Sequence, residues 1–221
     1  MSGDFSIKPR ACVFDFDGTL VDTMGGFADI AADVLEKHYG LPFAEGRKRY
    51  LETSGIPFFQ QLEIIQPGGR KNESCAQEFE SRKLDGFFDA APSEATVRGL
   101  ELLHNAGVKL VVSSNNFQNN VDDFLKKHPL PLDLALGFES NGMEKGRPHF
   151  LKVQQHFRVE PEEMLFCGDS LKDGERADSC GVPFVGKTGT FTREQFSERF
   201  PGIVTVESIL ELAERLLLDQ A

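Results

Sequence analysis

Residues 10–19 read Arg-Ala-Cys-Val-Phe-Asp-Phe-Asp-Gly-Thr, an apolar run that ends in two aspartates and a glycine. A short apolar run bounded by turn residues is typical of a buried strand. We therefore predict a first strand over residues 10–16, closed by the turn residues Asp17 and Gly18. The rest of the chain has to supply the partners that bury this strand.

Similar apolar runs recur later, and segments with helical spacing of apolar residues separate them. The runs cover residues 108–112, 164–167 and 182–185, with weaker candidates at 134–138 and 203–206. The helical segments cover residues 93–105, 116–127 and 207–218, the first with Ser93 as a capping residue. Strands that alternate with helices of this length predict β-α-β units. The expected fold is thus α/β, a doubly wound parallel sheet covered by helices on both faces.

One segment, residues 22–91, interrupts this alternation. It contains no convincing strand, only helical patterns at residues 27–38, 57–65 and 74–84. We predict two domains: a core made of residues 1–21 and 92–221, and a small helical domain made of residues 22–91. The linker Thr53-Ser54-Gly55-Ile56-Pro57 inside the helical domain is a candidate for substrate contact, although it could equally do no more than join two helices.

Composition limits the classes of partner. The 221 residues include 35 acidic and 24 basic side chains, for a net charge of −11. This balance disfavours nucleic acid and anionic membranes as general partners, and no apolar run is long enough to span a bilayer. The four cysteines lack the paired short spacing of a zinc site. We expect them to be reduced and structural, in a cytoplasmic protein without a signal peptide.

Polar side chains gather where the predicted strands end. In a doubly wound sheet, ligands bind beyond the carboxyl ends of the strands. The groups expected there are Asp15, Asp17, Ser113, Ser114, Asn115, Asp169 and Asp173. Four of them are carboxylates, which would repel one another strongly unless a cation lay between them. Oxygen ligands without nearby His or Cys favour Mg²⁺ over zinc.

The pair Asp15 and Asp17 suggests a reaction. An ionised carboxylate can attack phosphorus directly, and a second carboxylate can protonate the leaving alkoxide and later deprotonate water. An Asp-x-Asp-Gly turn is also common in proteins without any catalytic role. The pair alone therefore leaves both interpretations open.

The full set of motifs is more specific. The chain has Asp15-Phe-Asp-Gly-Thr-Leu-Val-Asp22, then Ser113 after a buried strand, then Lys145, and finally Gly168-Asp-Ser-Leu-Lys-Asp173. In this order the motifs resemble those of the haloacid dehalogenase (HAD) superfamily, and especially its phosphatase branch. The resemblance covers nearly the whole chain. The inserted helical segment is similar to the helical cap of phosphoglycolate-phosphatase-like members.

The resemblance implies a role for each motif residue. Asp15 would be the nucleophile and Asp17 the general acid/base. Asp15, the backbone carbonyl of Asp17 and Asp169 would hold Mg²⁺, with Asp173 joining the metal site through water or orienting Lys145. The substrate phosphate would be bound by Ser113, with its neighbour Ser114, and by Lys145. His149 and His156 have no place in this scheme, and we expect His149 to be a helix-start or turn residue.

The third motif departs from the family pattern, which often reads Lys-Pro-x-Pro. Residues 144–149 read Glu-Lys-Gly-Arg-Pro-His, so either Lys145 or Arg147 could be the motif's cation. We favour Lys145. The expected function is a Mg²⁺-dependent phosphatase for a small phosphorylated metabolite, acting through an aspartyl-phosphate intermediate.

Two alternative functions keep the same fold, a phosphomutase and a catalytically idle regulatory protein that binds phosphate or metal. A dehalogenase is disfavoured because that branch lacks the second aspartate, and Asp17 is present. The sequence alone indicates neither the substrate, nor the residues of the helical domain that select it, nor the oligomeric state.

Overall fold

The computed structural model describes residues 7–218, without the side chains of residues 85 and 86. The chain forms two compact units. One combines the N-terminal segment up to Val21 with everything from Pro92 onward, and the other is the segment Asp22–Ala91. Each unit is described by itself below.

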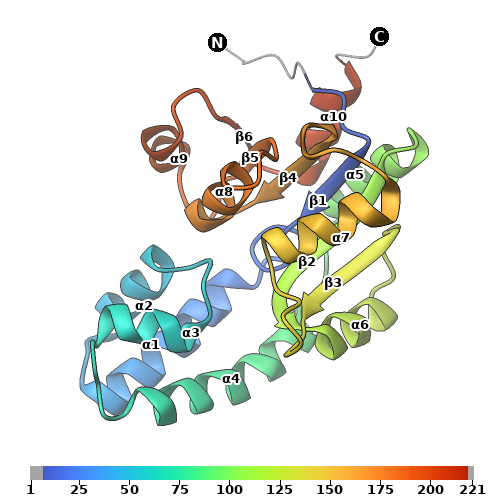
Figure 1. The fold of residues 1–221 in the computed structure, drawn as a ribbon. Coiled ribbons are helices and arrows are strands. Elements are labelled where there is room, and N and C mark those ends of the chain that lie inside the picture. The colour runs from blue at the N-terminus through green and yellow to red at the C-terminus, as the bar shows by residue number, and fades with distance from the viewer. Residues whose placement is uncertain (1–6, 219–221) are drawn as a thin grey trace. The chain divides into compact units, whose positions relative to one another are not determined.

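The larger unit is built on a six-stranded sheet (Figure 1). Its strands are β1 (Ala11–Phe14), β2 (Lys109–Phe117), β3 (Leu134–Phe138), β4 (Met164–Gly168), β5 (Phe184–Lys187) and β6 (Val204–Val206). Their spatial order is β3-β2-β1-β4-β5-β6, and every neighbouring pair is parallel. This is the Rossmann-like order, in which the chain builds outward from β1 in both directions. The predicted doubly wound α/β fold is confirmed.

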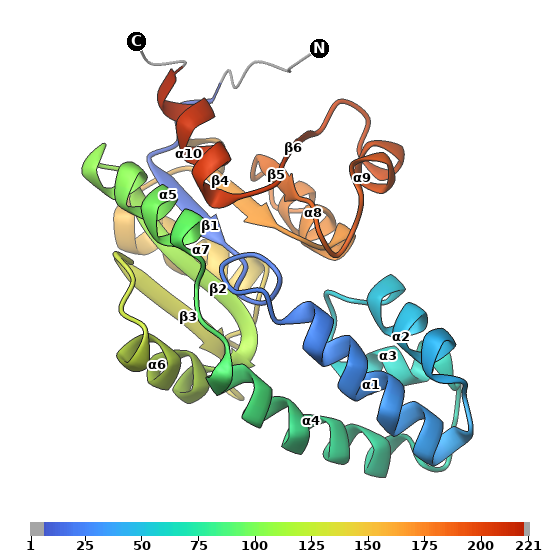
Figure 2. The ribbon, with the colours of Figure 1, turned by 180° about the vertical axis from the view of Figure 1, so that it is seen from behind.

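Helices cover both faces of this sheet, as the two opposite views show (Figures 1 and 2). On one face, α7 (Arg147–Phe157) and α8 (Leu171–Asp178) bury Phe150, Val153 and Ala177 against Val13 and Val111. The other face carries α5 (Glu94–Asn105) beside α10 (Ile209–Leu218), where Gly99 lets the two backbones approach closely. The remaining elements of this unit are α6 (Gln118–Lys127), α9 (Arg193–Arg199) and a 3₁₀ turn (Pro161–Glu163).

The smaller unit contains four helices, α1 (Met24–Tyr39), α2 (Phe43–Glu52), α3 (Phe58–Ile65) and α4 (Asn72–Asp89). Its centre is aromatic. The rings of Phe58 and Phe79 lie 4.2 Å apart between centroids, and Tyr50 packs against both. Aromatic contacts of this kind add to the hydrophobic burial that holds so small a helical unit together.

The ends of the elements differ from the predictions in places. The second strand continues past residue 112 to Phe117, so the polar residues from Ser113 onward lie in the strand itself, near a register shift between Ser113 and Phe117. The sequence patterns do not predict helices α7, α8 and α9 individually; α8 and α9 are only 8 and 7 residues long, and α7 lacks a side-chain cap. None of the helices within residues 7–218 combines the length and the apolar character that crossing a bilayer requires.

Candidate active site

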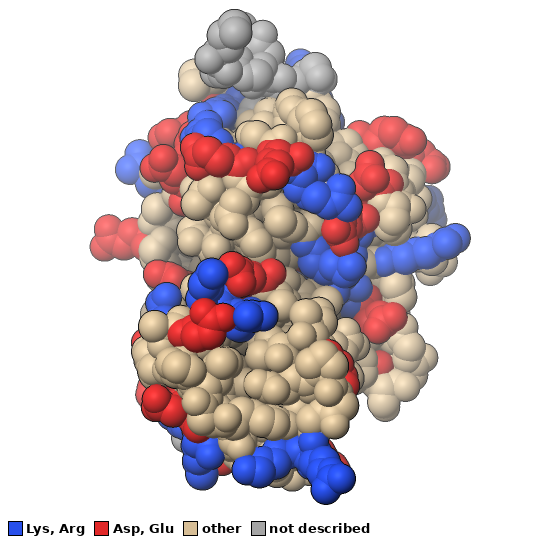
Figure 3. Space-filling view, turned by 90° about the vertical axis from the view of Figure 1, so that its left-hand side faces the viewer, with Lys and Arg blue, Asp and Glu red and all other residues tan. Residues whose placement is uncertain are grey.

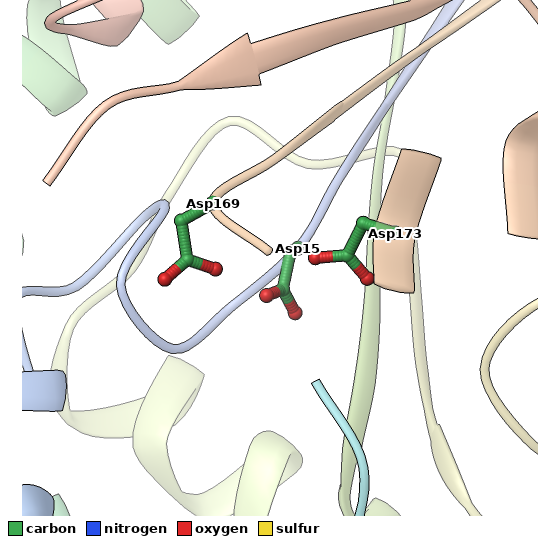
Figure 4. Close-up of side chains that lie close together, drawn as sticks. All are labelled: Asp15, Asp169 and Asp173. Carbon is green, nitrogen blue, oxygen red and sulfur yellow. The ribbon is translucent and has the colours of Figure 1, made fainter. Parts of the chain in front are cut away.

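Three carboxylates converge at the carboxyl end of the central strands. Asp15 follows β1, Asp169 follows β4, and Asp173 lies in the first turn of α8 (Figure 4). One oxygen from each of the three lies within 4.8 Å of the others, and all three side chains are buried. The position follows from the topology, because β1 and β4 are neighbours and end at the same edge of the sheet.

Lys145 supplies a cation to this cluster. Its Nζ lies 2.7 Å from Asp15 Oδ1 and 2.7 Å from Asp173 Oδ1, and the lysine is itself buried. Arg147, the alternative residue for this motif, is exposed at the start of α7. The structure therefore brings Lys145, and not Arg147, together with the carboxylates.

Asp173 is fixed by its own helix. Ser170 caps α8 and accepts a hydrogen bond from the Asp173 amide, while the Ser170 hydroxyl donates to Asp173 Oδ2 at 2.7 Å. Gly168 makes this approach possible, because a Cβ at that position would lie 2.7 Å from Asp173 Oδ2. With one oxygen held by Ser170 and the other by Lys145, Asp173 is placed to orient the lysine.

Burial and like charge dominate the electrostatics. Burial raises the pKa of Asp15 well above its ordinary value, the nearby Asp173 and Asp169 carboxylates add to this, and Lys145 opposes it. Burial and Asp173 likewise raise the pKa of Asp169. Burial alone would lower the pKa of Lys145, but the two contacting carboxylates outweigh it and raise that pKa. Lys145 and Arg176, which lies 3.4 Å from Asp173 Oδ1, thus do not prevent the pKa values of Asp15 and Asp169 from rising.

The residues fit a divalent, oxygen-liganded cation. Asp15 and Asp169 offer buried carboxylate oxygens, whose pKa values are raised first by burial and then by the neighbouring carboxylates. Mg²⁺ is commonly bound by one or two carboxylates together with waters and phosphate oxygens. Among the described residues, the side-chain group suited to a metal contains Asp15, Asp169 and Asp173, and not the Asp17 side chain.

Asp17 points its carboxylate elsewhere. Its Oδ2 accepts a hydrogen bond from Asn116 Nδ2 at 2.7 Å, so the end of β2 holds the carboxylate that the sequence predicts as the acid/base. The Asp17–Val21 turn is tight, with Gly18 at a φ of 74°. The backbone of this turn and the Asn116 amide together fix where the Asp17 side chain can lie.

The two predicted phosphate-binding serines have different surroundings. Ser113 Oγ lies 2.8 Å from Nδ1 of His149, whereas Ser114 Oγ accepts a hydrogen bond from the backbone N–H of Asn116 at 3.0 Å. Both serines are buried in β2. His149 lies in the first turn of α7, where the sequence predicts a helix-start residue.

Sequence reasoning missed Asn116, Thr190 and the contact of His149. Thr190 donates a short hydrogen bond to Asp169 Oδ2 from the loop after β5. It could have been found, because β5 ends at the same sheet edge as the strands that were searched. The contact of His149 joins residues 36 positions apart, so no local pattern indicates it.

Comparisons with known proteins show the family of this chain. The model of the haloacid dehalogenase-like hydrolase family matches residues 12–187, a range that contains every predicted site residue. The chain belongs to this family. Among HAD relatives, a phosphoglycolate phosphatase of Photorhabdus laumondii is 30% identical, over 81% of this chain and 80% of its own length. A phosphoglycolate phosphatase of Salmonella paratyphi A is 28% identical over 81% of each chain.

Solved structures support the HAD fold. A haloacid dehalogenase-like family hydrolase from Streptococcus pneumoniae superimposes with a TM-score of 0.78 over 94% of this chain and 98% of its own, at 20% identity. The CbbY protein of Rhodobacter sphaeroides, solved in complex with phosphate, gives a TM-score of 0.69 over 92% and 96% of the two chains, at 19% identity. Because the chain belongs to the HAD family and the relatives that match it are named phosphatases, we conclude that it is a HAD phosphatase.

Proposed function

We propose that the protein is a Mg²⁺-dependent phosphatase that hydrolyses a small phosphorylated metabolite through an aspartyl-phosphate intermediate. The observation that carries the proposal is the Lys145 ammonium group, 2.7 Å from both Asp15 and Asp173 and next to Asp169. A nucleophilic carboxylate, a cation and a metal-binding carboxylate in one buried cluster are what phosphoryl transfer requires. Phosphoryl transfer depends mainly on positioning and on neutralisation of charge.

In the first step, Asp15 attacks phosphorus and forms an acyl phosphate, while the bond to the leaving oxygen breaks. Asp17 protonates that oxygen, so the alcohol leaves neutral. In the second step, Asp17 accepts a proton from water, the water oxygen attacks phosphorus, and the Asp15 carboxylate is released together with inorganic phosphate. Lys145 and a serine at the end of β2 would hold the phosphoryl oxygens throughout.

Asp15 and Asp169 would hold Mg²⁺, with the Asp17 backbone carbonyl as a further oxygen ligand. When bound, the ion neutralises charge on the phosphoryl group and on the carboxylates around it. Asp173 would act through Lys145 rather than as a direct ligand, because both of its oxygens already contact protein donors. Thr190 would orient Asp169.

A panel of phosphorylated metabolites, assayed for released phosphate with Mg²⁺ and with excess chelator, tests the proposal. Phosphoglycolate comes first in the panel, because relatives at 30% and 28% identity are named for it. Phosphate release that stops in chelator and returns with Mg²⁺ is the expected result. An isomer formed without phosphate release would identify a phosphomutase, and the absence of any turnover would favour a regulatory protein.

The nucleophile has its own prediction. Asp15→Asn should lower kcat by several orders of magnitude with the fold unchanged, because an amide of almost the same shape is a poor nucleophile. Asp22→Asn, the same change at an exposed residue seven positions later, is the matched control and should leave kcat nearly unchanged. Turnover of Asp15→Asn above a few per cent of the parent protein, in the presence of Mg²⁺, would refute the mechanism.

A further inference from the structure

His149 connects three elements of the larger unit. It lies in the first turn of α7 and its side chain is fully buried. Nδ1 lies 2.8 Å from Ser113 Oγ on β2, and Nε2 lies 3.1 Å from the carbonyl oxygen of Gly137 on β3. One imidazole thus links the start of a helix to the carboxyl ends of two neighbouring strands.

The direction of these hydrogen bonds follows from their chemistry. A carbonyl oxygen only accepts, so Nε2 carries the proton and donates to Gly137. Burial lowers the pKa of His149 to about 4, so the ring is neutral near pH 7 and Nδ1 is bare. Nδ1 must therefore accept the hydroxyl proton of Ser113. That proton is directed away from any substrate, and we assign the phosphoryl contact at this strand end to Ser114.

In the loop before His149, residues 139–143 are held by their own hydrogen bonds, including those of Met143 with Glu139 and Asn141, but none of these reaches Lys145. Lys145 lies between Gly142 and Gly146, whose φ values of 95° and 110° belong to the region that favours glycine. Glycine leaves a backbone free to adopt other conformations. The Lys145 head is held by Asp15 and Asp173, but its backbone enters the site from this permissive loop. The first directional side-chain contact after the loop is that of His149.

We propose that His149 is a positioning residue, which ties α7 to β2 and β3 and thereby fixes where Lys145 enters the active site. The inference rests on the proposed function, because it assigns His149 a role in the same phosphoryl transfer. A displacement of about 1 Å in a charge-stabilising group can cost roughly a hundredfold in rate. Such a displacement acts on the transition state more than on the binding of substrate.

The test compares variants of the intact protein at saturating Mg²⁺, on a substrate for which the parent protein releases phosphate. His149→Phe keeps an aromatic ring, somewhat larger than imidazole, and removes both hydrogen bonds. We expect kcat to fall roughly 10- to 100-fold with a much smaller change in KM. Inhibition by orthovanadate, used as a transition-state analogue, should weaken by a similar factor.

A matched control separates positioning from general destabilisation. Phe150→Leu, at the next residue of α7, removes buried apolar packing against Phe166 without touching the polar tie. It should lower the melting temperature while kcat stays near that of the parent protein. If both variants lose kcat in proportion to their loss of melting temperature, His149 is merely structural and the inference is wrong.

Two conservative variants each keep one of the two hydrogen bonds of His149, and they also cover the case in which His149→Phe does not fold. In His149→Gln the side-chain amide can still donate to the Gly137 carbonyl oxygen. In His149→Asn the side-chain carbonyl oxygen can still accept from the Ser113 hydroxyl. If His149→Phe folds, at least one of these two variants should have a kcat between that of His149→Phe and that of the parent protein. If His149→Phe does not fold, at least one of the two should have a kcat below that of the parent protein. Parent-like kcat in His149→Gln and His149→Asn alike would overturn the inference and leave the proposed function intact.

A double-mutant cycle tests whether His149 acts through Lys145. In a Lys145→Ala background the position of the missing ammonium no longer matters, so adding His149→Phe should lower kcat by less than about threefold. Additive losses would show that His149 acts by another route and would contradict the proposal.

Discussion

At the scale of single residues, the open question in the third motif was whether its cation is Lys145 or Arg147. Lys145→Ala should cost about 2–4 kcal/mol of transition-state stabilisation, the scale for losing one preorganised charge-stabilising group. Arg147→Ala, at an exposed position two residues later, should cost little. Values of kcat and KM measured at saturating Mg²⁺ compare the two. The reverse order of effects would move the motif's cation to Arg147.

His149 also makes a prediction about pH and stability. Its pKa falls from about 6.5 to about 4 on folding, through burial first and then through the positive charges of Lys145 and Arg176. The unfolded chain therefore binds the proton more tightly. The stabilisation from the neutral ring is complete above about pH 6.5 and is lost as the pH falls toward 4. By pH 5 the loss should reach about 2 kcal/mol.

Denaturant unfolding between pH 7.5 and pH 5 measures this effect. The raised pKa values of Asp15 and Asp169 act in the opposite direction, because the folded state binds those protons more tightly as the pH falls. Comparison with His149→Gln removes their contribution, since both proteins share it. An equal pH dependence in the two proteins would contradict the assigned proton state of His149.

The residues that the sequence could predict are those whose position follows from strand ends. Asp15 and Asp169 follow buried apolar runs, so the sheet-edge rule alone brings them together. That rule does not predict which side chains contact the site residues. Asn116 meets Asp17 across 99 positions of sequence, and His149 meets Ser113 only because α7 packs on the face of β2 to which Ser113 points.

At the scale of elements, the long central strands and the capped helix were the most predictable. The N-cap of α5 is Ser93, which accepts from the Thr96 amide as the sequence indicates. Helix α7 was harder to predict, because it starts with an exposed arginine and its N-cap residue, Gly146, has no side chain to cap it. It packs in the core through Phe150 and Val153, and the contact of His149 with Ser113, which no local pattern contains, ties its first turn to β2.

The helical unit 22–91 can be removed to test whether the larger unit folds and binds Mg²⁺ without it. We propose that it is a cap that selects the substrate. Val21 and Pro92, which flank it in the chain, are paired in an antiparallel bridge, so a short Gly/Ser linker could join them. The shortened protein should fold, bind Mg²⁺ and discriminate poorly among phosphorylated substrates, because the unit proposed to select them is gone.

Circular dichroism, a Mg²⁺ titration and the metabolite panel would check that expectation. Replacement of residues 66–69, the Gln-Pro-Gly-Gly turn within the helical unit, by an equally flexible linker is the control for a chain change that keeps the unit. A shortened protein that does not fold would show that the helices are an integral part of the core, and unchanged discrimination would show that they do not select the substrate.

At the scale of the whole molecule, negative charge is spread unevenly between surface and site. The chain carries a net charge of −11, yet on the face in Figure 3 acidic and basic side chains lie next to one another. Exposed ion pairs in the chain include Arg47–Asp29 and Arg82–Asp33. Exposed pairs contribute little to stability, about 0–1 kcal/mol each. The buried cluster is where added positive charge should have most effect.

Mg²⁺ should therefore raise the melting temperature far more than monovalent salt at the same ionic strength. Monovalent ions screen the exposed charges, whereas an ion bound between Asp15 and Asp169 stabilises the folded state by mass action, by about 2.7 kcal/mol at a hundred times its dissociation constant.

Asp169→Ala removes one buried carboxylate, so its metal-free melting temperature should rise. The same variant should lose the Mg²⁺-specific shift, while Glu194→Ala, at an exposed position in α9, should keep it. Thermal melts in Mg²⁺, in matched NaCl and in chelator give the three values for each protein, and a full Mg²⁺ shift in Asp169→Ala would place the metal elsewhere.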